Sequence, residues 1–146
     1  MTGLALSIVL QAALLSNGAQ PYNRAFYEAE ASGRPLLVLV GADWCPGCRT
    51  MKQSVLPQMA QSGRLNNVSL SIVNTDAESA LASRLMRGSS IPQLIVFSKT
   101  NKGWHREQID GAASSVAVEA MIRRAVDVQH GSWTARVQPT MGAVGN

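Results

Sequence analysis

Five consecutive aliphatic residues, Leu36 to Val40, limit the possible folds of this 146-residue chain more than any other feature. A strand with one face in water alternates apolar and polar residues, whereas an unbroken apolar run indicates a strand buried on both faces. Such a strand lies at the centre of a sheet that carries helices on both sides. Residues 41–43 then turn the chain, and we expect a helix to start at Cys45.

The remaining pattern predicts one small α/β domain over residues 22–128. Asn23 is the expected cap of an extra N-terminal helix that Gly33 ends, and Pro57 must break or bend the helix that starts at Cys45. Thr75 and Glu78 have the spacing of a capping box. The expected strands are residues 36–40, 68–73, 93–98 and 104–109, and the further expected helices are residues 23–32, 58–64, 75–86 and 115–128.

These elements follow one another as β-α-β-α-β-β-α and predict a mixed, four-stranded central sheet. The first two strands should be parallel, because a helix connects them through a right-handed crossover. The last two strands are separated only by residues 99–103, which predicts an antiparallel hairpin. From residue 129 to residue 146 the sequence has no periodicity, and we expect a loose tail.

Composition and charge favour a globular protein and give no support to nucleic-acid binding. Hydrophobic residues make up 46% of the chain and charged residues 15%, which is typical of a folded domain. The net charge is only +4, and Arg123 and Arg124 are the only adjacent cations. A nucleic-acid interface would need basic residues gathered on one face.

Residues 1–19 have the pattern of a signal peptide. An apolar run from Leu4 to Leu15 carries no charged side chain, and small residues follow it at 16–19, as at a cleavage site. The run is short for a bilayer span, although an uncleaved anchor or a buried first helix stay open as alternatives. We therefore expect an exported protein, either periplasmic or secreted.

The only two cysteines, Cys45 and Cys48, are three positions apart. A disulfide that closes so short a ring stabilises a fold by only about 2 kcal/mol, against about 3 kcal/mol for a 15-residue loop. A structural disulfide stays open, but this weak effect favours a chemical function. Zinc would need further ligands, and only His105 and His130 are available. Haem attachment would need a histidine where Arg49 stands.

The sequence around the two cysteines suits thiol chemistry. A cysteine at a helix N-terminus faces free N–H groups and the positive end of the helix dipole, which favours its thiolate. We expect Cys45 to be exposed there, with Cys48 shielded one turn later. Pro46 suits the first helical position, and Gly47 leaves room for a partner chain to approach.

A second motif, Ile91–Pro92, directly precedes a predicted strand. With Trp44, Cys45, Cys48 and Gly111, it falls in the order and at about the spacing of the thioredoxin superfamily, which the chain resembles over roughly residues 34–128. Residues 33–45 are most similar to periplasmic thioredoxin-like domains, above all to the C-terminal domain of the transmembrane thiol reductase of the Dsb system.

The resemblance implies a protein-disulfide oxidoreductase that acts without metal or organic cofactor. It implies that Cys45 is the nucleophile, that Cys48 is the resolving thiol, and that the two form a redox-active disulfide. It also implies a cis Ile91–Pro92 bond whose backbone pairs with an extended substrate. Trp44 would form an apolar wall beside the sulfurs, unless it acts by packing alone. Protein disulfides are the implied substrates of a monomer, and a reductase in an oxidising compartment needs a membrane thiol donor.

The sequence departs from the family pattern at two places. Leu39 stands six residues before Cys45, where thioredoxin itself has a buried aspartate that could take a proton from the resolving thiol. The dipeptide Pro46–Gly47 reverses the common order and supplies no histidine to stabilise a thiolate. With Leu39, either Cys48 loses its proton to water or to an unidentified base, or turnover is slow at neutral pH. The absence of a stabilising histidine favours a reductant or a middling exchanger over a strong oxidant. A disulfide oxidase or isomerase, and a non-catalytic peptide-binding module, are the alternatives.

Overall fold

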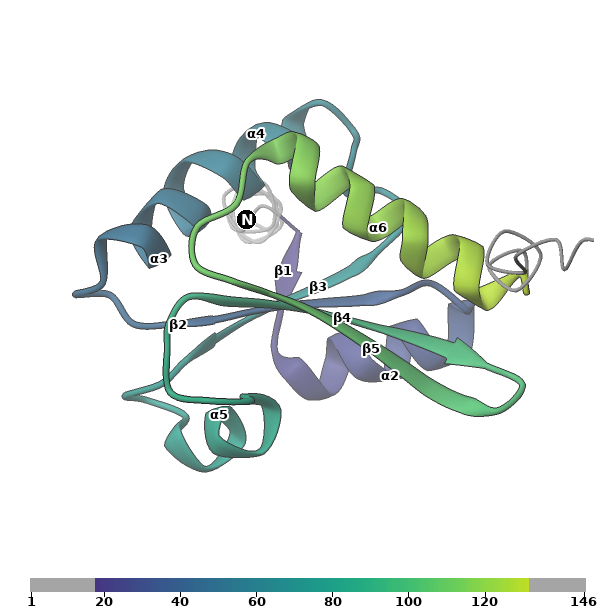
Figure 1. Cartoon of the computed structure of the whole chain (residues 1–146), viewed down its shortest axis with the longest axis horizontal. Helices are drawn as coiled ribbons and strands as arrows, with labels where there is room; N and C mark the ends of the chain where they lie inside the picture. The colour runs from purple at the N-terminus through teal and green to yellow at the C-terminus, as the bar shows by residue number, and fades with distance from the viewer. Residues whose placement is uncertain (1–17, 132–146) are drawn as a thin grey trace, which may run out of the picture.

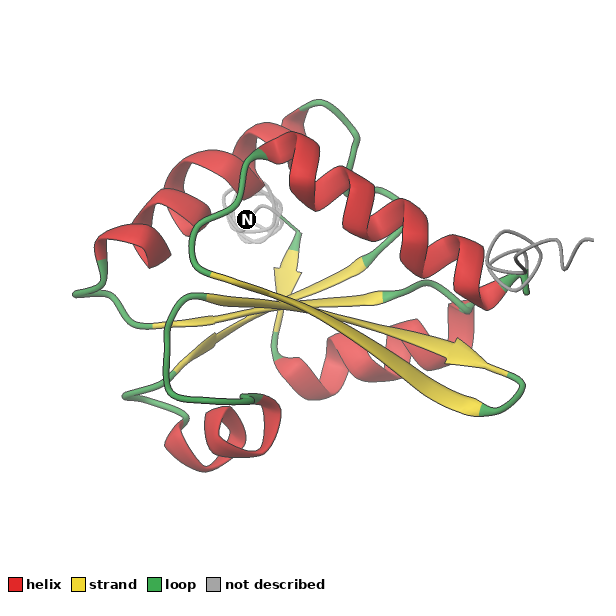
Figure 2. Cartoon of the chain, viewed as in Figure 1, coloured by secondary structure: helices red, strands yellow, loops and turns green. Residues whose placement is uncertain are grey.

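The computed structural model describes residues 18–131, which form one five-stranded sheet with helices on both faces (Figures 1 and 2). The strands stand in the order β1-β3-β2-β4-β5. They are β1 (Ala19–Gln20), β2 (Leu36–Gly41), β3 (Ser69–Asn74), β4 (Gln93–Thr100) and β5 (Gly103–Asp110). The helices are α2 (Tyr22–Ser32), α3 (Pro46–Thr50), the π-helical turn η1 (Met51–Val55), α4 (Leu56–Gln61), α5 (Ser79–Leu85) and α6 (Ser115–Gln129).

Strand β2 is the centre of the sheet, as its aliphatic run predicts. All six of its residues are buried. It pairs in parallel with β3, where Leu39 lies opposite Ile72, and antiparallel with β4, where Leu39 lies opposite Leu94. The hairpin of β4 and β5 is antiparallel, as expected.

Alternate residues of β2 feed two separate hydrophobic cores. Leu37 and Leu39 pack in the core under η1, α4 and α6, together with Met51 and Leu94. The neighbouring positions of β2 pack on the other face with residues of α2 and α5, namely Leu36, Val38 and Val40 with Ala25, Ala29, Ala82 and Leu85. Burial on both faces explains why the strand is uninterrupted by polar residues.

A fifth strand, β1, corrects the expected count of four. Ala19 and Gln20 pair in parallel with Leu70 and Ser71 of β3. Two residues are too few to show a strand period, so the pattern gave no signal for them. Ala19 therefore belongs to the sheet, although we placed it at the end of the signal peptide; residues 1–17 of that segment lie outside the described residues.

Two helices start at other residues than the sequence predicts. Helix α2 is preceded by Pro21 rather than capped by Asn23, and no side chain caps it. The expected capping box at Thr75 and Glu78 is wrong, because α5 starts only at Ser79. Asn74 Oδ1 instead accepts hydrogen bonds from the N–H groups of Asp76 (2.8 Å) and Ala77 (3.1 Å), and this Asx-type turn delays the helix.

Pro57 does not end the helix that follows Cys45. The helical path continues from α3 through η1 into α4, where Pro57 occupies the first turn. A π-turn just before a proline removes the need for the N–H that proline lacks. At the other end of the chain, α6 reaches Gln129, one residue into the expected tail; residues 132–146 of that tail lie outside the described part. None of the helices in residues 18–131 is long and apolar enough to cross a membrane.

Replacing Leu94 by alanine should test the core that supports β2. Leu94 is fully buried opposite Leu39, and comparable truncations cost about 2–5 kcal/mol. Urea unfolding should show a loss in this range. Val116, which is 69% exposed, is the control, since Val116→Ala should change the free energy of unfolding by less than about 0.5 kcal/mol. Equal effects of the two substitutions would contradict the assigned core.

Candidate functional site: the Cys45–Cys48 pair

Cys45 is the N-terminal cap of α3, and its own sulfur makes the capping contact. Its backbone is extended (φ −84°, ψ 120°), and Cys45 Sγ accepts a hydrogen bond from the N–H of Cys48 at 3.3 Å. The helix starts at Pro46, one residue after the expected position, and this proline occupies the first turn as predicted. The Cys45 sulfur therefore lies at the N-terminal end of the helix, against a backbone N–H.

Both thiols are free, and both are buried. Cys45 is 6% exposed and Cys48 is 4% exposed. The expectation that Cys45 is exposed while Cys48 is shielded is therefore wrong, because both residues are almost fully buried. The loop before β4 covers Cys45, whose Sγ lies 3.8 Å from the carbonyl oxygen of Ile91.

The Ile91–Pro92 loop lies against the cysteine turn. The peptide bond between Ile91 and Pro92 is cis, as the resemblance implies, and the Pro92 carbonyl accepts a hydrogen bond from the N–H of Gly111 at 2.8 Å. A Cβ atom on Gly47 would stand 3.2 Å from Pro92 Cδ and 3.6 Å from Ala112 Cβ. The space beside Gly47 is thus filled by the protein's own chain, which corrects the expectation that it admits a partner.

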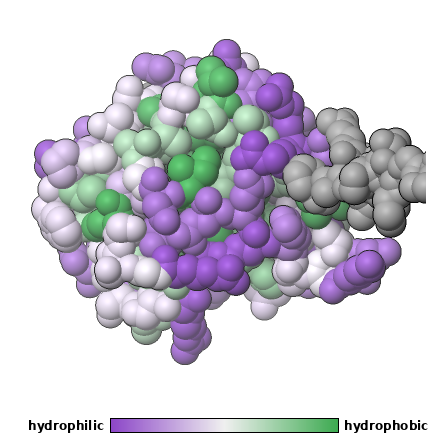
Figure 3. All heavy atoms as spheres, in the orientation of Figure 1, coloured by the Kyte–Doolittle hydropathy of each residue, from purple (hydrophilic) through white to green (hydrophobic). Residues whose placement is uncertain are grey.

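Trp44 stays at the surface beside the pair rather than packing in the core. It is 66% exposed, and its Nε1 donates a hydrogen bond to Asp76 Oδ2 at 3.0 Å. A shallow pocket of about 490 Å³ separates it from α5 and the Ile91 loop, and it is lined by Trp44, Thr75, Ser83, Met86, Gly88, Ser89 and Ile91. On the face shown in Figure 3, hydrophobic residues gather mainly toward the side of α3 and α4, while hydrophilic residues cover the middle, where β5 runs. Trp44 is thus not a core residue, and its role as an apolar wall beside the sulfurs stays a prediction.

Burial raises the pKa of the Cys48 thiol to about 11. The hydrogen bond with the Cys45 side chain is the next cause, since it favours the protonated form of Cys48. A negative charge on the Cys45 sulfur would act in the same direction. The Cys48 thiol is therefore harder to ionise than an ordinary cysteine thiol.

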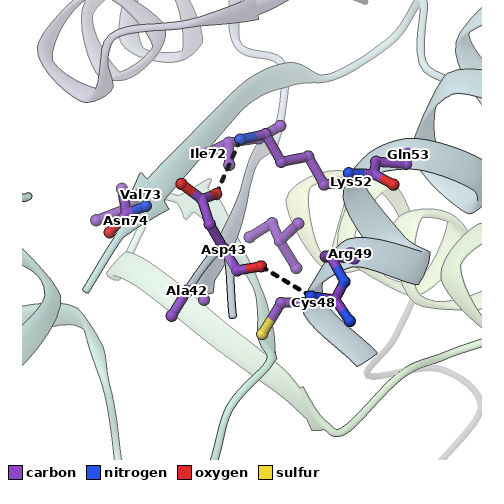
Figure 4. A pocket seen from close by; sticks show the side chains of 11 residues that line it. Ala42, Asp43, Cys48, Arg49, Lys52, Gln53, Ile72, Val73 and Asn74 are labelled. Atoms are coloured by element: carbon purple, nitrogen blue, oxygen red, sulfur yellow. Dashed lines mark hydrogen bonds and ion pairs between the residues drawn. The ribbon is translucent and has the colours of Figure 1, made fainter. Parts of the chain in front are cut away.

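A second, small pocket of about 130 Å³ lies behind Cys48 (Figure 4). Leu39, Gly41, Ile72 and Val73 line it with apolar groups or bare backbone, and Ala42, Asp43, Arg49, Lys52, Gln53 and Asn74 complete its wall. Lys52 Nζ is 3.4 Å from Asp43 Oδ1, and Arg49 Nη1 donates to the Asp43 carbonyl at 3.4 Å. Leu39 is 1% exposed.

Sequence reasoning missed the side chain that fixes the Ile91 loop. Gln93 is fully buried, and its Nε2 donates to the carbonyls of Arg87 (2.9 Å) and Ser90 (3.0 Å). Its Oε1 accepts a hydrogen bond from the N–H of Arg87 at 3.2 Å. A polar residue in a predicted buried strand was the one available signal, since such a side chain needs local partners. Lys52, one turn after Cys48, was also missed.

No metal site accompanies the cysteines in the described part of the chain. Within residues 18–131, no three or more histidine, cysteine, aspartate or glutamate residues are placed to hold an ion together.

Comparisons with known proteins agree with this fold. A family model described as thioredoxin-like matches residues 18–99, more than half of the chain, and the protein therefore belongs to the thioredoxin-like family. The search of curated proteins finds no match.

Solved structures of thioredoxins have the same fold. The thioredoxin of Thermus thermophilus is 21% identical, with a TM-score of 0.65, over 82% of this chain and 95% of that one. Trxlp of Edwardsiella tarda EIB202 is 30% identical, with a TM-score of 0.56, over 71% and 96%. Mitochondrial thioredoxin 3 of Saccharomyces cerevisiae is 20% identical, with a TM-score of 0.54, over 70% and 89%.

Gly41→Ala should disturb Cys48 directly. A Cβ atom at this position would lie 2.6 Å from Cys48 Sγ and 2.9 Å from Cys48 Cβ, so the sulfur must move. Such overpacking costs about 1–3 kcal/mol, which urea unfolding of the reduced protein can measure. In a Cys48→Ala background the cost should shrink, because the shorter contact is gone. An equal cost in both backgrounds would show that the sulfur is not what the new methyl group meets.

The stability of the reduced protein should fall as the pH rises from about 9 to about 11. The unfolded thiol ionises near 9.0, whereas folding raises the pKa of Cys48 to about 11. Ionisation therefore favours the unfolded chain within this window, and the stabilisation present below it is lost. Urea unfolding against pH should show a steeper decline for wild type than for Cys48→Ser. Identical declines would contradict the raised pKa of Cys48.

Proposed function

We propose that this protein is an exported thiol–disulfide oxidoreductase that reduces disulfide bonds in other proteins through Cys45 and Cys48. One observation carries the proposal: the Cys45 sulfur caps a helix, 3.3 Å from the Cys48 N–H, and touches the Ile91 loop. This arrangement provides an activated sulfur, a second thiol one turn away and an adjacent backbone for binding substrate. A thioredoxin-like fold with a Cys-x-x-Cys pair fits this class of reaction.

The proposed reaction has two displacements. The Cys45 thiolate attacks one sulfur of the substrate disulfide, forms a mixed disulfide and releases the other substrate sulfur as a thiolate. Cys48 then loses its proton and attacks Cys45, which releases the second substrate thiolate. The substrate gains two electrons and the protein becomes the Cys45–Cys48 disulfide. The backbone of Ile91 and the open pocket beside Trp44 support binding of an extended peptide next to Cys45.

The protonation of the pair favours reduction over oxidation of substrates. Strong oxidants of this kind are strong because their reduced dithiol form is stabilised. Here no histidine or lysine is within hydrogen-bonding distance of either sulfur among the contacts of residues 18–131, and the pKa of Cys48 is raised. The reduced pair thus has little extra stabilisation, which supports a reductase over a disulfide oxidase or isomerase.

Export and an electron donor complete the proposal. A reductase in an oxidising compartment turns over only if another molecule reduces it again, so we propose a membrane thiol as the electron donor. We also propose that the protein is a monomer. Strand β1 favours the first of two cleavage points, after Gly18 or after Ala19. Cleavage after Gly18 would keep both residues of β1 in the mature chain, whereas cleavage after Ala19 would remove one of them.

Trapping experiments test the two cysteine assignments. Cys48→Ser should accumulate a mixed disulfide with a protein substrate such as insulin, because the second displacement is blocked, and Cys45→Ser should not. Wild type should reduce insulin catalytically when dithiothreitol is supplied, whereas a non-catalytic binding module would give no turnover.

Limiting iodoacetamide at neutral pH should alkylate Cys45 first, since the raised pKa keeps Cys48 protonated. Preferential alkylation of Cys48 would reverse the assignment.

A further inference from the structure

The second displacement, in which Cys48 attacks the mixed disulfide, requires deprotonation of a buried thiol. Cys48 is buried, and its thiol must lose a proton before its sulfur can attack. The residues that surround the inner end of the pocket behind it, Leu39, Gly41, Ile72 and Val73, carry no group that could accept that proton. The proton therefore has to travel from Cys48 to the solvent at the protein surface.

The pocket behind Cys48 provides such a route. Its volume of about 130 Å³ has room for about four water molecules at their share of liquid volume. Gly41 lines the inner end and leaves the space that the Cys48 sulfur occupies there, since a Cβ atom would lie 2.6 Å from that sulfur. The outer end is polar. The side chains labelled in Figure 4 come from the turn before Cys45, from α3 and η1, and from β3, and β2 adds Leu39 and Gly41 to the lining.

The charged groups of this pocket are few, and Asp43 is the only acid among them. The others that line it are Arg49 on α3 and Lys52 on η1, and Cys45 is the titratable group that faces the Cys48 sulfur directly. Strands β2 and β3 contribute no titratable side chain to the lining. Lys52 pairs with Asp43 Oδ1 at 3.4 Å and holds the carboxylate at the pocket rim. Exposed pairs of this kind add little to stability, so stability alone does not account for the arrangement.

We infer that this pocket is the exit route for the Cys48 proton and that the Asp43 carboxylate receives the proton through water. The inference rests on the proposed thiol–disulfide exchange. As the Cys48 S–H bond breaks, the proton passes by way of water to Asp43 and from there to bulk solvent. The electron pair left on Cys48 Sγ forms the bond to Cys45 Sγ, the bond from Cys45 to the substrate sulfur breaks, and the substrate leaves as a thiolate.

The state of Cys45 affects this step. While Cys45 is free, its sulfur hydrogen-bonds with the Cys48 side chain and favours the protonated form of Cys48. Once Cys45 is joined to substrate, it can no longer carry a negative charge, and that opposition is removed. Burial, the largest cause of the raised pKa of Cys48, is still present in the mixed disulfide, so the proton still needs a route to solvent.

Stopped-flow reaction with dithiobis-nitrobenzoate separates the two displacements. The first thionitrobenzoate released reports attack by Cys45 and depends on reagent concentration. The second reports attack by Cys48 on the mixed disulfide and does not depend on it. Cys48→Ser should release only the first. Because the probe is a small disulfide, the assay works even if the protein reduces no protein substrate, and failure of the proposed function would show separately in the insulin assay.

Asp43→Asn should slow the second phase about fivefold or more near pH 7 and change the first less than about twofold. The slowed phase should then rise about tenfold per pH unit, because attack waits on the thiolate fraction, whereas wild type should show a shallower rise. Asp43→Glu should restore the second phase, since it keeps a carboxylate at the rim. Asp110→Asn, an exposed aspartate outside the pocket, is the charge-matched control and should leave both phases unchanged.

Ile72→Phe tests the route without changing any titratable group. Ile72 is half-buried and lines the pocket, so the larger side chain should fill it and slow the second phase alone, while Ile72→Val should not. Urea unfolding verifies that each variant is folded. If folded Asp43→Asn or folded Ile72→Phe resolves the mixed disulfide at the wild-type rate from about pH 6 to about pH 9, the inference is overturned.

Discussion

The close packing of Cys48 against the end of β2 is the contact on which the rest of the site depends. Gly41, the last residue of β2, leaves the space that the Cys48 sulfur occupies, since a Cβ atom there would lie 2.6 Å from it. Because β2 is buried between two cores, its end is fixed in position. The helix that begins at Pro46 is thereby held with its first turn against the sheet, and Cys45 is held at its N-terminus. The fold thus fixes both sulfurs through one strand end.

The two thiols are distinguished by their surroundings more than by their access to solvent. Cys45 sits at the positive end of a helix and accepts the N–H of Cys48, whereas Cys48 is enclosed by β2, Gly41 and the apolar end of a small pocket. Burial raises the pKa of Cys48, so the second displacement is limited by where its proton can go. Leu39 beside the pair cannot accept this proton. The pocket that leads from Cys48 to the surface provides the route for the proton instead.

Sequence patterns predicted the features that depend on many residues or on a strong local rule. The aliphatic run of β2, Pro46 at the helix start and Gly33 at the end of α2 all stood where the structure has them. The errors have local physical causes. Asn74 out-competed the Thr75 capping box through its own backbone contacts, and β1 pairs through only two residues that carry no pattern. Other features depend on tertiary placement, which no spacing in the sequence reveals. These are the ion pair of Asp43 with Lys52, the hydrogen bonds of Gln93 to the Ile91 loop, and the closeness of Pro92 to Gly47.

The reduction potential of the Cys45–Cys48 couple tests the central claim most directly. Proteins of this kind range from about −270 mV for a reductant to about −120 mV for a strong oxidant, and about 30 mV corresponds to about 1.4 kcal/mol for two electrons. A pair whose reduced form gains no stabilisation beyond a helix N-terminus should lie at the reducing end, below about −200 mV. Equilibration with glutathione redox buffers, read by alkylation of the remaining thiols, gives the value. A potential above about −150 mV would contradict the account and identify an oxidant instead.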